Sequence, residues 1–391
     1  MTTALEADRM EPGAPISRWL YPLAAPLIAL AAALSITSIA LLLSGHNPIE
    51  AYRVMVKYAF RTDSLVSIVN RAVPYFLGGL AVAIGFRMRL FNIGVDGQYR
   101  LAAVVAAAAG AALDLPAGLH VLVVLVLAMS VGMAWAAVPA VLKVTRGVNE
   151  VISTIMMNFV ATGLAAFLLQ NHFRVKGEPV SKTKLIASSG RIGSLDPVLG
   201  WFGVKLPAGI HLQGFVIIAV VLGIAFHVLV TRTTFGYALR ASGTNPTAAV
   251  VGGIAPRAMT IKVMLISGAI AGLVGMAPLL SEYYRYAEAG FPTQLAFTGI
   301  AVALLGRNNP VGIAVGSLVF AFIERGSVAL DNLSIPSEIS KIMQGSMILA
   351  GVIGYEVVRR RSVAAAARTA AASVPMSTET GPTGVRTADA R

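Results

Sequence analysis

The sequence contains no cysteine and has few charged residues. Without cysteine, the chain can form neither disulfide bonds nor thiolate metal sites. Only 13% of its 391 residues are charged, whereas 56% are hydrophobic. Soluble domains carry roughly 25% charged residues, so this balance indicates an integral membrane protein.

Several motifs of enzymes are also missing. The sequence has no G-x-x-x-x-G-K-[ST] phosphate-binding loop, so we do not expect the chain to hydrolyse nucleotides itself. It has no G-x-S-x-G nucleophile motif, and its 5 histidines are scattered without the spacing of metal ligands. We therefore expect no catalytic residue, no metal site and no cofactor bound by this chain.

The net charge of +13 does not indicate a nucleic-acid-binding protein. The lysines and arginines fall in connections and tails, and no face combines basic with aromatic residues. Attraction to the inner leaflet of a lipid bilayer, and orientation within it, explain this distribution better.

The apolar runs predict an all-α, polytopic membrane protein. A helix needs about 20 apolar residues to span a bilayer, and on this measure residues 19–358 contain about ten spans. They are 19–44, 64–86, 91–113, 117–142, 149–170, 213–230, 262–281, 294–306, 310–326 and 338–358. The eighth and ninth are short and separated only by Gly306–Pro310, so they are also compatible with one broken hairpin.

The lysine and arginine bias predicts that both termini are cytoplasmic. On this topology the long loop 171–212 is external, the loop 231–262 is cytoplasmic, and the amphipathic segment 46–61 lies on the outer interface. Residues 1–18 and 359–391 form cytoplasmic tails. The second tail is rich in Ala, Thr, Ser and Pro without apolar periodicity, which predicts disorder.

A polar, glycine-broken octet, Phe91–Gln98, interrupts two apolar runs. Its polar residues and glycines are Asn92, Gly94, Asp96, Gly97 and Gln98. Backbone that leaves a regular helix near lipid must be buried in protein or line a water-filled path, so these residues are candidates for lining a substrate pathway. The alternative is an ordinary turn in which Asn92 and Asp96 cap the next helix.

A polar stripe follows at helical spacing in the span 149–170. Its pathway candidates are Glu150, Ser153 and Asn158. A polar stripe on a spanning helix should face the protein interior or a cavity. The alternative is that Asn149 and Glu150 only begin the helix, where an acid suits the helix dipole.

The cytoplasmic loop 231–262 is too polar to span a membrane and too patterned for a linker. Its characteristic residues are Gly236, Arg240, Gly243, Asn245 and Ala248. Pro246 predicts the start of a short helix with a small, apolar side. Such a helix is suited to docking into a groove of a partner protein; the alternative is a solvated loop helix.

These three segments together resemble those of a known transporter family. Residues 91–98 match F-N-I-G-x-[ED]-G-Q, residues 147–154 match G-x-N-E-V-I-x-T, and residues 234–249 match a cytoplasmic coupling segment. The chain thus resembles, over roughly residues 45–358, an ABC importer permease of the branched-chain amino acid and ribose permease superfamily. More narrowly, it is similar to the nucleoside permeases that work with basic-membrane-protein lipoproteins.

The resemblance implies a permease fold with two internal repeats in a bacterial inner membrane. It also implies a second, related permease as heterodimer partner, an ATPase with two nucleotide-binding domains that uses the ATP, and an extracytoplasmic substrate-binding lipoprotein. Nucleosides would be the substrate, with Arg240 and Asn245 seating the coupling helix on the ATPase. Alternatives are a permease for a sugar or another small polar solute, or an ion-coupled secondary transporter. A membrane anchor subunit would have no need for buried amides.

Overall fold

The structure, a computed structural model, describes most of the chain. The described residues are 17–203, 206–291, 294–336, 338–339, 341–346 and 349–350. Within them the chain is helical, with two isolated β-bridges, Lys182 to Ala287 and Ser194 to Gln213. The predicted cytoplasmic tails lie outside these residues, apart from the first two residues of the first helix.

The helices follow one another with short connections, except between α6 and α8. In chain order they are α1 (Ser17–Leu43), α2 (Pro48–Ala59), α3 (Thr62–Phe86), α4 (Val95–Ala112), α5 (Leu119–Arg146), α6 (Glu150–Leu168), η2 (Leu169–Phe173), η3 (Ser188–Gly190), α7 (Asp196–Trp201), α8 (Phe215–Arg232), α9 (Thr234–Thr244), α10 (Pro246–Val251), α11 (Pro256–Leu273), α12 (Met276–Pro278), η4 (Leu279–Tyr283), η5 (Glu288–Gly290), α13 (Leu295–Leu305), α14 (Pro310–Ser327) and η6 (Val328–Leu333).

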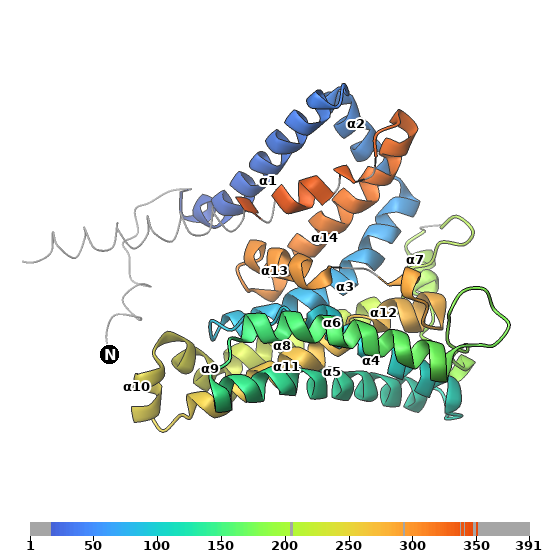
Figure 1. The fold of residues 1–391 in the computed structure, drawn as a ribbon. Helices are drawn as coiled ribbons and strands as arrows, with labels where there is room; N and C mark the ends of the chain where they lie inside the picture. Colours follow the sequence, from blue (N-terminus) through green and yellow to red (C-terminus); the bar gives the residue numbers. More distant parts are fainter. Residues whose placement is uncertain are drawn as a thin grey trace, which may run out of the picture.

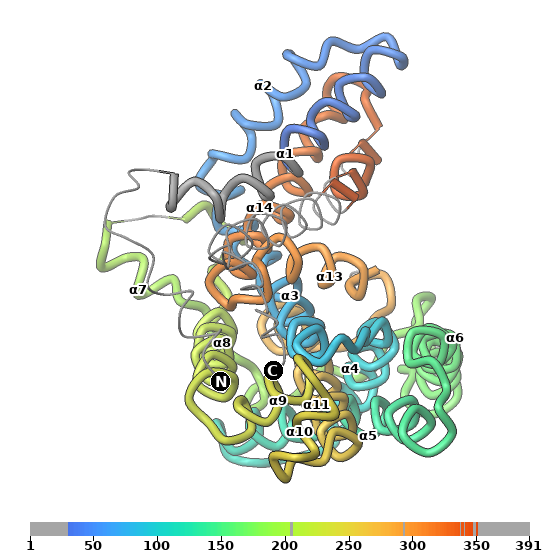
Figure 2. Tube along the Cα trace, turned by 90° about the vertical axis from the view of Figure 1, so that its left-hand side faces the viewer, coloured from blue at the N-terminus to red at the C-terminus, as the bar shows by residue number. Residues whose placement is uncertain are grey.

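One bundle of helices forms the larger part of the molecule. In Figure 1, α4, α5, α6, α8 and α11 run side by side, and α3 leads from this bundle toward α1, α2 and α14. The short helices α9 and α10 project from one end of the bundle, and the loop that contains α7 lies at the other end. Figure 2 views the bundle from the α9–α10 end, with α11 between α4, α5 and α9. The segment that contains α9 and α10 and the loop that contains α7 are thus separated by the full length of the bundle.

Glycines allow α11 to pack closely against α5. A Cβ atom on Gly272 would overlap the carbonyl oxygen of Ala128, and one on Gly132 would overlap that of Gly268. Lipid offers no hydrophobic drive for helix association, so small residues that permit close backbone contact stabilise such pairs. The small residues Gly132, Gly268 and Gly272 therefore let the backbones of α5 and α11 approach closely.

Seven helices of the described part are long and apolar enough to span a membrane, or up to eight if the bent pair α1–α2 is one span. The bend between α1 and α2 is 119°, and α2 coincides with the amphipathic segment predicted at 46–61. The predicted break at Gly306–Pro310 separates α13 from α14. The count of about ten spans stays a prediction, because the last predicted span, 338–358, runs beyond the described residues. The two internal repeats stay a prediction as well.

Candidate functional site

A buried amide network holds the connection between α3 and α4. The Nδ2 of Asn92 donates to Gln98 Oε1 at 2.9 Å and to Ser267 Oγ at 2.8 Å. The Oδ1 of Asn92 accepts from Gln98 Nε2 at 3.1 Å and from the Gly94 N–H at 3.0 Å. Ser267, on α11, donates to the carbonyl oxygen of Ala81 on α3 at 2.5 Å. Both donors and both acceptor sites of the Asn92 amide are therefore used inside the protein.

Helix α6 satisfies the backbone of the same connection. Asn158 Oδ1 accepts from the Gly97 N–H at 2.8 Å, and Asn158 Nδ2 donates to the Ile93 carbonyl oxygen at 2.7 Å. Thr154 Oγ1 accepts from the Ile93 N–H at 3.3 Å. A Cβ on Gly97 would lie only 2.8 Å from the Ala161 Cβ, so glycine is needed for this approach. This part of the polar stripe faces the protein interior.

Asp96 caps a helix that lies far away in the sequence. Its Oδ1 accepts from the Leu295 N–H at 2.9 Å, and its Oδ2 accepts from the Ala296 N–H at 3.2 Å. These residues begin α13, whose N-cap residue Gln294 provides no side-chain hydrogen bond of its own. A carboxylate at a helix N-terminus pairs with unsatisfied N–H groups and suits the helix dipole. The turn alternative expected Asp96 to cap the following helix, but it caps α13.

Glu150 and Ser153 lie at the start of α6 and have local partners. Glu150 Oε2 lies 2.5 Å from Lys143 Nζ. The Asn149 side chain caps α6 by accepting from the Val151 N–H at 2.8 Å, and Ser153 Oγ donates to the Asn149 carbonyl oxygen at 3.1 Å. Asn149 thus caps the N-terminus of α6, and Glu150 is the first residue of the helix.

The structure brings together most of the predicted pathway residues around the α3–α4 connection. These are Asn92, Gly94, Asp96, Gly97, Gln98 and Asn158. Their hydrogen bonds fix the break in the helix and its contacts with α6, α11 and α13. Whether they also line a substrate pathway stays a prediction.

Replacing Asn158 with leucine should destabilise the fold. The Gly97 N–H and the Ile93 carbonyl oxygen would lose their Asn158 hydrogen bonds, and an unpaired buried polar group costs about 1–3 kcal/mol. The matched control is Asn171→Leu, because Asn171 bonds an exposed carbonyl one turn away. We expect thermal unfolding in detergent to show a lower midpoint for Asn158→Leu than for Asn171→Leu. Equal midpoints would contradict the role of Asn158.

Side-chain caps begin both α9 and α10. Thr233 Oγ1 accepts from the Gly236 N–H at 3.1 Å, and Asn245 Oδ1 accepts from the Ala248 N–H at 3.1 Å. Pro246 occupies the first turn of α10, where a missing N–H costs nothing. The short helix predicted at Pro246 is confirmed as α10, and Asn245 and Ala248 form its N-terminal cap.

The end of α9 packs onto the α3–α4 connection through Gly243. A Cβ on Gly243 would overlap the carbonyl oxygen of Arg87. Arg87 Nη2 donates to the Asn308 carbonyl oxygen at 2.8 Å, in the turn between α13 and α14. Arg240, on α9, donates to the Val230 carbonyl oxygen. Burial of the Arg87 guanidinium, and secondly the nearby positive charge of Arg240, lower the pKa of Arg87. Arg87 thus connects α9 with two turns at this end of the bundle.

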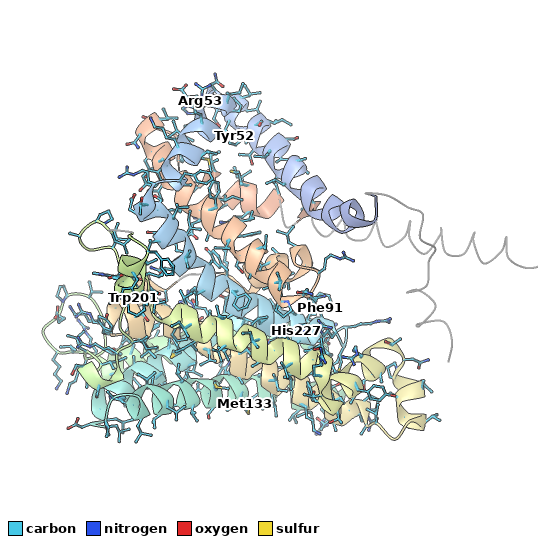
Figure 3. The ribbon with its side chains drawn as sticks, turned by 180° about the vertical axis from the view of Figure 1, so that it is seen from behind. Tyr52, Arg53, Phe91, Met133, Trp201 and His227 are labelled. Carbon is cyan, nitrogen blue, oxygen red and sulfur yellow. The ribbon has the colours of Figure 1, made fainter. Side chains whose placement is uncertain are left out.

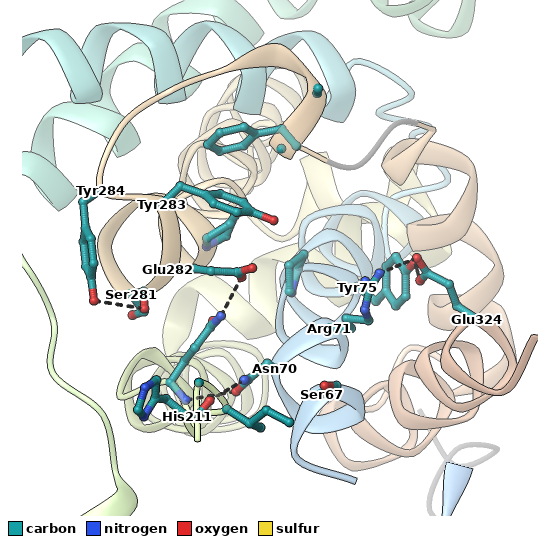
Figure 4. Close-up of a pocket in the computed structure, with 18 residues that line it drawn as sticks. Ser67, Asn70, Arg71, Tyr75, His211, Ser281, Glu282, Tyr283, Tyr284 and Glu324 are labelled. Atoms are coloured by element: carbon teal, nitrogen blue, oxygen red, sulfur yellow. Dashed lines mark hydrogen bonds and ion pairs between the residues drawn. The ribbon is translucent and has the colours of Figure 1, made fainter. Parts of the chain in front are cut away.

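A cavity of about 680 Å³ lies at the opposite end, between α3, α14, the loop before α8 and the segment 278–291. Figure 4 shows its polar side chains. Arg71 Nη1 lies 2.7 Å from Glu324 Oε1, and the Tyr75 hydroxyl donates to the same carboxylate. Gln213 Nε2 donates to Glu282 Oε2 at 2.9 Å. The predicted pathway residues are not among the described residues that line this cavity.

Our sequence reasoning missed the residues of this cavity. A signal for them was present, because Arg71, Glu282 and Glu324 are ionisable residues within or beside apolar helices. Ionisable side chains at such positions usually face a protein interior or a water-filled space, and they pair with one another.

Comparisons with known proteins identify the family. Residues 64–352 match the family model described as branched-chain amino acid transport system / permease component. The chain is 33% identical over 342 residues to the guanosine ABC transporter permease protein NupP of Bacillus subtilis (strain 168), covering 86% of this chain and 95% of the relative. It is 30% identical to the glucose ABC transporter permease protein TsgB13 of Haloferax volcanii, covering 87% and 90%. It is 29% identical to the nucleoside ABC transporter permease protein NupB of Lactococcus lactis subsp. cremoris, covering 83% and 88%. The chain belongs to the family of branched-chain amino acid transport system permease components and is a permease subunit of an ABC importer.

Proposed function

We propose that this chain and a second, related permease form the membrane pathway of an ATP-driven importer of nucleosides in a bacterial membrane. The observation that carries the substrate class is the 33% identity, over 86% of the chain, to a relative named as a guanosine permease. A second relative, named as a nucleoside permease, is 29% identical over 83% of the chain.

In this proposal the ATPase subunit docks on α9 and α10, which face the cytoplasm together with both termini. Three apolar side chains of these helices are exposed: Tyr237 at 65%, Val250 at 59% and Val251 at 88%. A short helix that presents apolar side chains is suited to a hydrophobic groove on a partner. That partner binds and hydrolyses ATP. The contact between Gly243 and Arg87 transmits the movement of the ATPase subunit from α9 to the α3–α4 connection.

The substrate-binding lipoprotein delivers its cargo to the other end of the bundle. The loop that contains α7 lies at that end, away from α9 and α10 (Figure 1). Residues 209–211 and 213, which follow α7, line the cavity between α3 and α14. A substrate released there enters the membrane pathway, which the second permease completes.

A sugar is the second candidate substrate. It is favoured by the 30% identity, over 87% of the chain, to a relative named as a glucose permease. A nucleoside and a sugar are both neutral and rich in hydroxyl groups, so amide and carboxylate side chains suit either one.

Uptake by the complete transporter tests this proposal. Both permeases, the ATPase and the lipoprotein would be expressed in cells without nucleoside uptake of their own, and labelled guanosine and glucose supplied separately. We expect guanosine uptake that unlabelled nucleosides suppress and that disappears when the phosphate-binding lysine of the ATPase is replaced. Uptake that survives this replacement would refute ATP-driven import. Uptake of glucose alone would favour the sugar permease.

A further inference from the structure

The cavity near α7 has walls held together by hydrogen bonds. Asn70, on α3, donates to the His211 carbonyl oxygen at 2.8 Å and accepts from the Gln213 N–H at 3.0 Å. These bonds fasten α3 to the loop before α8, on one side of the cavity. The volume, about 680 Å³, lies within the roughly 300–1,000 Å³ of pockets that bind small molecules. The cavity therefore has the size and the fixed walls of a ligand site.

The charges of the lining favour a neutral ligand. Glu324 is paired with Arg71 at 2.7 Å, and Glu282 accepts from the neutral Gln213 at 2.9 Å. The His211 Nδ1 is 2.5 Å from Asp196 Oδ2. The lining thus holds two carboxylates and one guanidinium, and the guanidinium is already paired. A ligand with a phosphate group would meet an excess of negative charge, whereas a neutral ligand would not.

One wall of the cavity presents a supported aromatic ring. Tyr283 is 41% exposed and packs against Phe291, with ring centroids 6.3 Å apart and an angle of 53° between the rings. A Cβ on Gly290 would lie 3.1 Å from the Tyr283 ring, so the ring sits closely over this backbone. Figure 4 shows Tyr283 beside Glu282 on the same wall. An aromatic surface and an acceptor of hydroxyl hydrogen bonds therefore stand next to each other.

We propose that this cavity binds a neutral nucleoside, whose base stacks on Tyr283 and whose ribose hydroxyls donate to Glu282. The proposal rests on the nucleoside import proposed above. A base offers a flat face on which an aromatic side chain can stack, and such stacking contributes to the binding energy of single-stranded nucleic acids to proteins as well. A carboxylate only accepts hydrogen bonds, so it matches the two hydroxyl donors of a ribose. The excess of negative charge in the lining admits neutral nucleosides and disfavours nucleotides.

Photoaffinity labelling tests the site. The assembled transporter in proteoliposomes would be labelled with 8-azidoguanosine, and the labelled peptide identified by mass spectrometry. We expect the label within residues 278–291, protected by guanosine and much less by guanosine 5′-monophosphate. Tyr283→Leu should lower labelling about fivefold or more, whereas Tyr283→Phe, which keeps the aromatic face, should stay within about twofold of wild type.

The control variant is Trp201→Leu. Trp201 lies on α7 at the same end of the molecule (Figure 3). It is 84% exposed and is not among the residues that line the cavity. If guanosine uptake persists, any of three results would overturn the proposed site. They are equal effects of Tyr283→Leu and Trp201→Leu, a label outside the cavity, and equal protection by guanosine and its monophosphate. Absence of guanosine uptake by the wild-type transporter would instead refute the proposed function, and the site with it.

Discussion

Gly243→Ala is expected to lower substrate uptake at least about tenfold while ATP hydrolysis continues. The added Cβ would overlap the carbonyl oxygen of Arg87, which is backbone and cannot turn aside as a flexible side chain would. Helix α9 must therefore move away from the α3–α4 connection, and overpacking of this kind displaces the backbone. A misplacement of about 1 Å is enough to cost a hundredfold in activity when geometry carries the function.

The measurement compares uptake and ATP hydrolysis in the same proteoliposomes. Gly252→Ala is the matched control, because Gly252 follows α10 on the same loop and its added Cβ would meet its nearest neighbour at 3.4 Å. Its φ of −79° also suits alanine. We expect the ratio of substrate moved to ATP hydrolysed to fall in Gly243→Ala and to be kept in Gly252→Ala. An unchanged ratio in Gly243→Ala would rule out coupling through this contact.

The lengths of the spans could be predicted because the bilayer sets them. The prediction 213–230 corresponds to α8 at Phe215–Arg232, and the prediction 310–326 corresponds to α14 at Pro310–Ser327. Hydrocarbon thickness and helix rise fix about 20 apolar residues for a span, so the signal is local and strong.

The partners of the polar break could not be predicted from the sequence. Polar groups at membrane depth must be satisfied, but the pattern does not distinguish water in a pathway from side chains of another helix. The structure supplies side chains and backbone: Asn92 bonds Ser267, 175 residues away, and Asp96 bonds Leu295, 199 residues away. Local patterns contain no information about which distant helix arrives at a given position.

The contacts that form the cavity also join residues far apart in the sequence, so local patterns could not predict them. Arg71 and Glu324 lie 253 residues apart and form one ion pair. Arg71 lies in α3 and Glu324 in α14, and nothing in the local sequence of either helix indicates which distant charge it pairs with. Only the packing of α3 against α14 brings them together.

Gly272→Ala should destabilise the protein, whereas the same change at Gly163 should not. At Gly272 the Cβ would overlap the Ala128 carbonyl oxygen, so α11 and α5 must separate. Overpacking costs about 1–3 kcal/mol and sometimes more, and α11 also packs against α3 and α4. At Gly163, on α6, no neighbouring atom lies within 4 Å of the added Cβ. Alanine in a helix is favoured over glycine by about 1 kcal/mol, so this variant should be at least as stable as wild type.

The two glycine variants therefore differ in the sign of their effect, and this difference separates packing from helix propensity. Both would be purified in the same detergent, and the midpoints of thermal unfolding compared with wild type. We expect a lower midpoint for Gly272→Ala and an equal or higher one for Gly163→Ala. Equal upward shifts would mean that helix propensity, and not the contact with Ala128, sets the outcome, whereas equal downward shifts would contradict the open space around Gly163. A lower midpoint for Gly272→Ala alone would show that the close contact of α11 with α5 stabilises the bundle, whose two ends carry the cavity and the helices α9 and α10.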